Sequence, residues 1–303
     1  MSFSNKIRVA VLRGGPSPAY EESLKTGDYV LSLLREMPEK YDPIDIFISR
    51  DGEWHYGGVS SEPHQILSDV DAVWNGLHGT YGEDGGVQKL LNSLQKPFTG
   101  SGITASAFAH NKDLSKKLYK RHSLLTPDHT VVSQESFSDE ELIKIFRTYL
   151  HPVIVKPATG VSALGIRMAH TFHELKEAIE KTFEHSSKVM VEEYVKGVNA
   201  TCAVIENGKG ERFYTLIPSG RHPIETNKQI EEMAKKAHEI LGQRHYSASD
   251  FVITPSGRVY ILETNSLPEL HEDSHLHHSL HATGWQPKDF CDHCLKLALN
   301  QLD

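Results

Sequence analysis

Two β-rich segments within residues 247–265 carry oxygen atoms at a spacing that could hold a metal ion. They flank a Thr-Pro-Ser-Gly stretch, which suits a type I turn with proline at its second position. If these four residues close a hairpin, Asp250 lies opposite Ile261. Because side chains alternate along a strand, Glu263 and Asn265 then share a face with Asp250. Two carboxylates and an amide oxygen are ligands that Mg²⁺ takes, whereas the plainer alternative is a solvated hairpin with its polar side chains outward.

A second cluster of polar residues follows the apolar run Ala72–Asn75, which predicts a strand. His78 and Glu83 lie among several glycines there, and glycines let the backbone approach a ligand closely. An imidazole at a strand end is suited to polarise or protonate a substrate carboxylate. Asp84 has a plainer explanation, since it can cap the helix that begins near Gln88.

A lysine and a small-residue loop indicate a phosphate site in the middle of the chain. The β run 153–157 contains Lys156, and residues 158–166 are mostly small. Consecutive backbone N–H groups in such a loop can bind phosphate, and Lys156 adds positive charge. An ordinary hairpin loop is the alternative for this segment taken alone.

The hydrophobic pattern predicts strands that alternate with helices first and antiparallel hairpins later. Further strands are predicted at 7–12, 41–48 and 188–195, with a hairpin at 201–216, and helices up to about 35, after 102 through 116, and over 171–184, 227–241 and 290–299. Gly14 and Gly15 follow the first strand, as in the opening of a doubly wound α/β lobe. The order therefore predicts an α/β lobe joined to α+β lobes.

Composition narrows the class of protein. At 303 residues the chain can form two or three lobes, and its net charge of −8 argues against non-specific nucleic-acid binding. No apolar run approaches the length of a membrane span, and the first residues have no signal-peptide core. Three cysteines imply a reducing compartment without a disulfide framework. We therefore expect a cytoplasmic protein of enzyme size with no nucleic-acid or membrane partner.

The motifs occur in an order that resembles the D-alanine–D-alanine ligases. They are Gly14-Gly15, His78-Gly79, Glu83-Asp84-Gly85, Gly100-Ser101-Gly102, Lys112, Lys156-Pro157, Ser162, Gly165, Glu192-Glu193, Asp250 and Glu263-Thr264-Asn265. The resemblance covers essentially the whole chain. It implies the ATP-grasp fold, with a Rossmann-like N-terminal lobe at 1–105, a central ATP-grasp lobe at 106–195, and a C-terminal ATP-grasp lobe at 196–303 that carries the metal site.

The resemblance also implies a reaction and its residues. In this family ATP phosphorylates a carboxylate, and an amine then attacks the acylphosphate, as a step in cell-wall precursor synthesis. The implied ATP-binding positions are Lys112 and Lys156 at the phosphates, Glu192 and Val195 with Glu193 at the adenine, and Asn199 at the ribose. The implied metal ligands are Asp250, Glu263 and Asn265, for two Mg²⁺ ions that Mn²⁺ can replace. The implied catalytic group is His78, Glu83 and Ser162, and the implied substrate positions are Gly14, Ser17, Glu269 and Ser274. The family also implies an amino acid or peptide as substrate, and a homodimer.

Several positions depart from the family pattern where it recognises amino acids. Ala19 replaces a glutamate, although Glu21 and Glu22 lie close by, and Ala248 replaces an arginine that stabilises an oxyanion. Glu269 replaces a glycine near the second substrate's carboxylate. Three interpretations therefore stay open: a ligase for D-alanine, a related ligase for another amino acid or peptide, and a degenerate homologue that binds ATP and regulates.

The carboxyl-terminal region is rich in histidine and holds a single Cys-x-x-Cys, Cys291 and Cys294. Imidazole and thiolate are zinc ligands, so a structural metal is one interpretation. The alternative is that 290–299 is an amphipathic helix and that the loop 269–278 lines the altered substrate pocket. We favour this second interpretation, because the chain has no second Cys-x-x-Cys.

Overall fold

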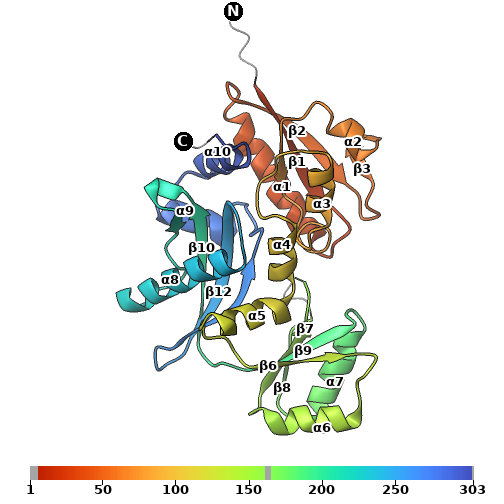
Figure 1. Ribbon diagram of the computed structural model, residues 1–303, viewed down its shortest axis with the longest axis vertical. Helices are drawn as coiled ribbons and strands as arrows, with labels where there is room; N and C mark the ends of the chain where they lie inside the picture. The colour runs from red at the N-terminus through yellow and green to blue at the C-terminus, as the bar shows by residue number, and fades with distance from the viewer. Residues whose placement is uncertain (1–5, 161–164, 302–303) are drawn as a thin grey trace, which may run out of the picture.

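The computed structural model describes residues 6–160 and 165–301, so Ser162 lies outside the described residues. Three β-sheets with flanking helices follow one another along the chain, and the middle one forms the lower part of the molecule in Figure 1. The N-terminal sheet has the order β4-β3-β2-β1-β5, with β1 parallel to both β2 and β5. Its elements are β1 (Ile7–Gly14), α1 (Tyr20–Arg35), β2 (Tyr41–Ile48), β3 (Trp54–Tyr56), β4 (Val59–Ser60), α2 (Pro63–Ile66), β5 (Ala72–Asn75) and α3 (Gly86–Ser93). The parallel strands confirm the predicted α/β opening.

The central and C-terminal sheets are each four-stranded, and all their pairs are antiparallel. The central sheet, ordered β6-β9-β7-β8, consists of β6 (His129–Ser133), α6 (Asp139–Thr148), β7 (Val153–Pro157), β8 (Arg167–Ala169), α7 (Phe172–Phe183) and β9 (Lys188–Glu193). The C-terminal sheet, ordered β11-β10-β12-β13, consists of β10 (Val198–Glu206), a 3₁₀ turn (Gly208–Gly210), β11 (Phe213–Thr215), α8 (Ile224–Ile240), β12 (Tyr246–Ile253) and β13 (Val259–Asn265), and is followed by α9 (His275–Ala282) and α10 (Pro287–Ala298).

The single helix predicted after Gly102 is two helices, α4 (Ile103–His110) and α5 (Lys112–Arg121), so that prediction was wrong in one respect. Asn111 between them has extended backbone angles, and its side-chain oxygen accepts hydrogen bonds from the first turn of α5. Asparagine favours this capping position because it satisfies N–H groups that have no helical partner. The break brings the Lys112 N–H to the carbonyl of Ala158, 2.9 Å away, beside the small-residue loop.

The predicted register of the β12–β13 hairpin is also corrected. Ile253 pairs with Val259, one residue further along than the four-residue loop requires, and the register shifts again after Asp250. Asp250 therefore lies directly opposite Glu263 and not opposite Ile261. A β-bulge of this kind inserts one extra residue and re-aims the side chains beside it. The prediction that both carboxylates and Asn265 share one face still holds.

Hydrophobic cores show which parts are packed together. A shared core joins the N-terminal and C-terminal sheets and includes Val9, Trp74, Ala203, Tyr246, Phe290, Cys291 and Cys294. A helix-backed core lies between the C-terminal sheet, α5 and α8 and includes Tyr119, Cys202, Ala234 and Phe251. A central core, containing Val132, Val155, Ile179 and Val191, is made only from the central sheet and its two helices. The central sheet thus has a core of its own, whereas the other two sheets are joined by one.

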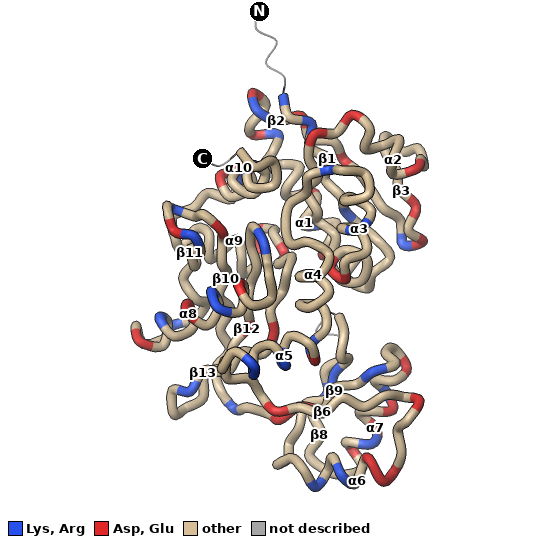
Figure 2. The backbone as a smooth tube through the Cα atoms, in the orientation of Figure 1, with Lys and Arg blue, Asp and Glu red and all other residues tan. Residues whose placement is uncertain are grey.

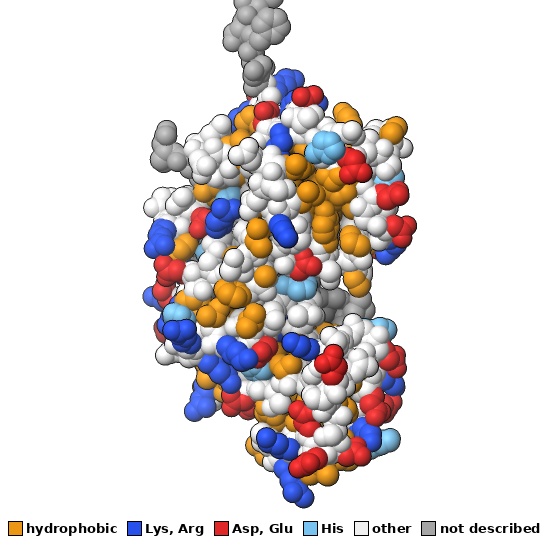
Figure 3. All heavy atoms as spheres, turned by 45° about the vertical axis from the view of Figure 1, so that its right-hand side comes forward, with side chains coloured by type: hydrophobic (Ala, Val, Ile, Leu, Met, Phe, Trp, Pro, Cys, Tyr) orange, Lys and Arg blue, Asp and Glu red, His pale blue; other side chains and the backbone are white. Residues whose placement is uncertain are grey.

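Charged residues of both signs are mixed along the described chain. Basic and acidic residues are interspersed along the described chain without a continuous basic stretch (Figure 2). On the face drawn in Figure 3, hydrophobic side chains gather over the N-terminal sheet, in the upper part. Among the described residues, no helix is both long and apolar enough to cross a bilayer.

Candidate active site

The two carboxylates of the β12–β13 hairpin lie at the centre of the site. Asp250 accepts a hydrogen bond of 2.6 Å from the hydroxyl of Thr201 on β10. Glu263 is 3.1 Å from the ammonium group of Lys112, the first residue of α5. Burial raises the pKa of Asp250 from 3.8 to about 6, and the neighbouring charge of Glu263 adds to this effect. Burial also opposes ionisation of Glu263, but the ammonium groups of Lys112 and Lys156 hold its pKa below the usual value.

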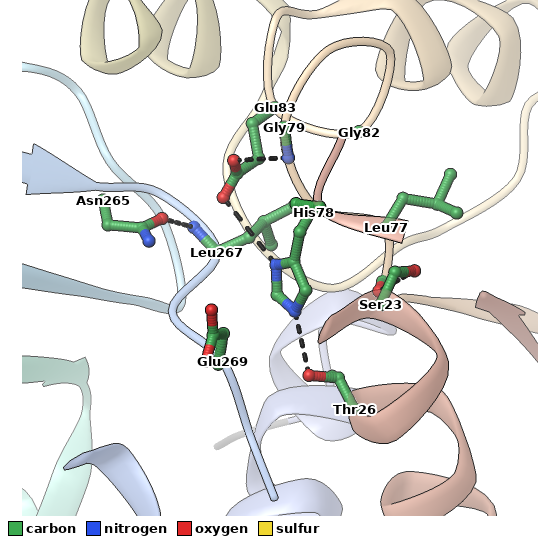
Figure 4. Close-up of polar contacts among 12 residues, drawn as sticks. Ser23, Thr26, Leu77, His78, Gly79, Gly82, Glu83, Asn265, Leu267 and Glu269 are labelled. Atoms are coloured by element: carbon green, nitrogen blue, oxygen red, sulfur yellow. Dashed lines mark hydrogen bonds and ion pairs between the residues drawn. The ribbon is translucent and has the colours of Figure 1, made fainter. Parts of the chain in front are cut away.

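This arrangement fits a divalent cation. Two half-buried carboxylates that face each other repel, and a cation between them would relieve the repulsion that, after burial, contributes to the raised pKa of Asp250. Asn265, two residues beyond Glu263, lies on the same face, and its side-chain oxygen accepts a 2.9 Å hydrogen bond from the Leu267 N–H (Figure 4). That contact fixes the amide and leaves the oxygen a second lone pair. The oxygen donor set is the kind that Mg²⁺ takes while keeping water ligands.

Lysines from two other elements converge on the same space. A cavity of about 560 Å³ is lined by Lys112 of α5 and Lys156 of β7, and also by Asp250, Glu263 and Asn265. The small-residue loop contributes Thr159 and Gly160 to this lining, and the N-terminal segments contribute Ala19, Glu22, His78 and Glu83. The structure thus brings together the two predicted phosphate lysines, the three predicted metal ligands and the His78–Glu83 pair.

Glu192 has a different environment from the one expected. Its carboxylate, predicted to lie at the adenine, is held between two lysines: Lys156 is 2.9 Å from one oxygen, and Lys116 is 2.6 Å from the other. Burial opposes its ionisation, but the two ammonium groups lower its pKa. Lys116, which is fully buried, was missed by our sequence analysis. The available signal was its position four residues after Lys112, on the same helix face.

The predicted adenine and ribose positions lie at the end of β9 in the central sheet and on β10 in the C-terminal sheet. Glu193 ends β9, and its N–H donates to the carbonyl of Asp128. Val195 follows it, and Asn199 is exposed on β10 opposite Val252. None of the cavities described here is lined by these three residues.

His78 and Glu83 form a buried pair at the end of β5 (Figure 4). The imidazole contacts Thr26 of α1 at 2.8 Å through Nε2, and its Nδ1 is 3.9 Å from Glu83. Glu83 also accepts a 2.8 Å hydrogen bond from the Gly79 N–H. These contacts fix the orientation of the imidazole, which together with Glu83 lines the cavity.

The segment after β1, where the resemblance implies that the first substrate binds, departs from the family pattern at Ala19. Gly14 has a φ of +88°, and a side chain there would collide with the carbonyl of Ile48, so glycine is required for the turn. Ser17 is buried and accepts from the Ala19 N–H. Of the two nearby glutamates, Glu21 pairs with Arg50 on the surface. Glu22 instead lines the cavity together with Ala19, three residues earlier, and is a candidate that our sequence analysis did not separate from Glu21.

A smaller pocket of about 200 Å³ adjoins the carboxylates. It shares Asp250, Asn265, Glu269 and His275 with the larger cavity. Its remaining lining includes Thr201, Ala248, Pro268 and Ser274. Glu269, Ser274 and His275 of the segment 269–278 therefore line a pocket beside the site. Glu272 and Asp273 do not line it, and the residues from His275 onward belong to α9 and not to the predicted loop.

Helix α10 accounts for the Cys-x-x-Cys. Cys291 and Cys294 are both fully buried in the shared core, where burial raises the pKa of each thiol. Within residues 6–160 and 165–301, no group of three or more His, Cys, Asp or Glu side chains is placed to hold a metal ion. The prediction of an amphipathic helix in this region is confirmed.

Known proteins are similar to this chain in sequence and fold. The family model described as the C-terminus of D-alanine–D-alanine ligase matches residues 118–218 and 215–296. A D-alanine–D-alanine ligase from Desulfotalea psychrophila is 32% identical, over 98% of this chain and 97% of its own. The chain belongs to the D-alanine–D-alanine ligase family. It therefore has the ATP-grasp fold and is an ATP-dependent ligase of this type, which the resemblance had implied.

Two solved structures of D-alanine–D-alanine ligase relatives align over nearly the whole chain. The VanG D-Ala:D-Ser ligase from Enterococcus faecalis has a TM-score of 0.86 at 26% identity and covers 97% of this chain and 100% of its own. The D-alanine–D-alanine ligase from Bacillus anthracis, solved in complex with ATP, has a TM-score of 0.80 at 26% identity, and 97% of each chain is covered. The family thus includes enzymes whose names give different second substrates.

Proposed function

We propose that this ligase joins D-alanine to a second amine-bearing substrate at the expense of ATP and Mg²⁺, in the cytoplasm. The observation that carries the proposal is the cavity in which Lys112, Lys156 and the ligand set of Asp250, Glu263 and Asn265 face one another. Phosphoryl transfer needs positive groups around the transferred phosphate and little covalent chemistry from the protein. The cavity offers that environment.

In the proposed reaction a carboxylate oxygen of the first substrate attacks the γ-phosphorus of ATP, and ADP leaves. The acceptor amine then attacks the acyl carbon, phosphate leaves, and the amine loses a proton. Asp250, Glu263 and Asn265 would hold Mg²⁺, which supplies charge neutralisation at the phosphates. Lys112 and Lys156 would orient the phosphates, while His78 and Glu83 would bind near the first amino acid.

Four further assignments complete the proposal. Each sheet falls within one proposed lobe, at 1–105, 106–195 and 196–303. Glu193, Val195 and Asn199 would contact the nucleoside from the junction of the last two lobes, and Ser162 the substrate. We also propose a homodimer, as the family implies, which sedimentation would test.

The direct test is phosphate release from ATP and Mg²⁺ with single amino acids and dipeptides. D-alanine-dependent release with formation of D-alanyl-D-alanine is the expected result. Release only with another amino acid would contradict the assigned substrate but not the ligase chemistry. Tight ATP binding without release on any candidate would favour the regulatory alternative.

The smaller pocket favours a second candidate, a ligase for an acceptor other than D-alanine. Among the described residues that line it there is no lysine or arginine, whereas Glu269 contributes a carboxylate. An acceptor's own carboxylate would be repelled by Glu269, since like charges a few ångströms apart near a protein surface cost roughly 1–3 kcal/mol.

Replacing Glu269 by glycine is therefore expected to lower the KM for D-alanine as acceptor by about tenfold. Steady-state kinetics at fixed ATP would measure it. Glu272→Gly, an exposed residue of the same loop outside both cavities, is the matched control. Ala248→Arg in the same assay tests whether an added positive charge also lowers the KM for D-alanine as acceptor. An unchanged KM in Glu269→Gly would show that Glu269 does not select the acceptor.

A further inference from the structure

Helix α5 carries two lysines one turn apart that contact different sheets. Lys112 pairs with Glu263 on β13, whereas Lys116 pairs with Glu192 on β9. Residues four apart lie on one face of a helix, so this face of α5 joins the metal hairpin to strand β9 of the central sheet. The helix itself is anchored to the C-terminal sheet, because the buried hydroxyl of Tyr119 donates 2.8 Å to Thr264.

Glu192 pairs with the ammonium groups of two buried lysines, of which only one reaches the cavity. Lys156 lines the large cavity. Lys116 is fully buried, lines neither cavity, and donates a second hydrogen bond of 2.8 Å to Thr126. One carboxylate cannot cancel two ammonium charges, so this group of three carries a net positive charge. The part of that charge which meets the cavity is on Lys156.

We propose that Lys116 is a positioning residue that neutralises Glu192 and thereby leaves the charge of Lys156 available to the triphosphate of ATP. Without the charge of Lys116, Lys156 and Glu192 would form a neutral ion pair, and the cavity would lose about one unit of positive charge. Buried ion pairs respond strongly to the loss of one member, because the remaining charges rearrange where water cannot screen them. The inference rests on the proposed contact between Lys156 and the phosphates.

The surroundings of Lys116 make its charge sensitive to pH. The charged or titratable groups that face it are Glu192 on β9, Lys156 on β7, Glu263 on β13 and His129 on β6. Burial lowers the pKa of Lys116, Glu192 opposes this effect and Lys156 adds to it, and together they bring the pKa from 10.5 to about 8. Lys116 is therefore charged below about pH 8 and neutral above it. Triphosphate affinity should be full below that pH and fall as the pH rises through it.

The test measures the binding of two probes by calorimetry. One probe is the non-hydrolysable ATP analogue AMP-PNP together with Mg²⁺, and the other is adenosine. In Lys116→Met at pH 7, we expect the dissociation constant for AMP-PNP to rise about tenfold, the usual scale for one charge-assisted contact. Adenosine, which has no phosphate, should bind within about twofold of wild type. Lys117→Met is the matched control, since Lys117 is the neighbouring lysine and its side chain is 66% exposed. An equal loss for both probes would mean that Lys116 merely supports the fold, and would overturn the proposal.

Two measurements keep the proposal testable if Lys116→Met folds poorly. The wild-type enzyme alone should lose AMP-PNP affinity between pH 7 and 9 while adenosine binding stays level, and a level profile for both probes would contradict the inference. Lys116→Arg keeps the charge at higher pH and should retain AMP-PNP affinity up to pH 9.

Lys156→Met separates this inference from the proposed function. Unchanged AMP-PNP binding in Lys156→Met would refute the assigned phosphate contact itself. Weakened binding in Lys156→Met together with normal binding in Lys116→Met would refute only the role of Lys116.

Discussion

Asp250→Asn is expected to lower ligase turnover by about 10³-fold while making the metal-free protein more stable. The turnover falls because a neutral amide binds a metal ion less well than a carboxylate does and neutralises none of its charge. Metal stabilisation of a phosphoryl transition state is worth several kcal/mol. The stability rises because the folded protein holds Asp250 with a pKa raised from 3.8 to about 6. At about 1.4 kcal/mol per unit, that shift corresponds to no more than about 3 kcal/mol of destabilisation when the group is ionised.

The sign of this effect gives the prediction a pH signature. A carboxyl group whose folded pKa is raised favours folding while it is protonated, and that contribution is lost as the pH rises through about 6. The free energies of unfolding of wild type and Asp250→Asn should therefore be similar below pH 4 and differ most above pH 7. Urea unfolding in the presence of a chelator measures this. Asp273→Asn, at an exposed aspartate nearby, should change neither quantity. A less stable Asp250→Asn at pH 7 would contradict the assigned burial of charge.

Trp74→Ala is expected to lower the free energy of unfolding by about 3–5 kcal/mol, the usual cost of removing a large aromatic side chain from a core. Trp74 on β5 is only 1% exposed. Its ring lies 6.2 Å from that of Tyr246 on β12, nearly parallel, and 6.4 Å from that of Phe290 on α10. It thus fills the place where the N-terminal sheet meets the C-terminal sheet, and the cavity left behind would weaken both.

The matched variant is Trp74→Phe, which keeps an aromatic ring and removes a buried indole N–H that has no hydrogen-bond partner. We expect it to cost less than about 1.5 kcal/mol. Urea unfolding followed by far-ultraviolet circular dichroism measures both variants. A loss below 1 kcal/mol in Trp74→Ala would show that the two sheets do not depend on a common core.

The sequence predicted the site better than its detailed geometry. Alternation along strands correctly places Asp250, Glu263 and Asn265 on one face, because a hairpin allows only two faces. The register could not be predicted, because residues 254–257 fit a type I turn that implies a different pairing, and no local residue pattern marks the bulge beside Asp250. The break at Asn111 was missed because the residues on either side are good helix formers, and only the capping contacts with α5 reveal it.

Other features depend on contacts between distant segments. Lys116 lies in a lysine-rich helix and looks like a solvated residue until Glu192, far away in sequence, is placed beside it. Glu22 and Glu21 are equivalent in the sequence, and only the turn of α1 sends one to the cavity and the other to Arg50. Local patterns therefore identify strands, helices and motifs, whereas the partners of buried charges require the fold.

The distribution of the cysteines decides which parts of the chain a thiol reagent can report on when they unfold locally. Cys202 lies in the helix-backed core, Cys291 and Cys294 lie in the shared core, and the chain has no other cysteine. The central core is therefore without a thiol. Because a buried thiol with a raised pKa reacts only after its surroundings unfold, alkylation by a thiol reagent would report on the N-terminal and C-terminal sheets alone. Opening of the central sheet would escape such labelling, and comparison with amide hydrogen exchange would reveal it as exchange without alkylation.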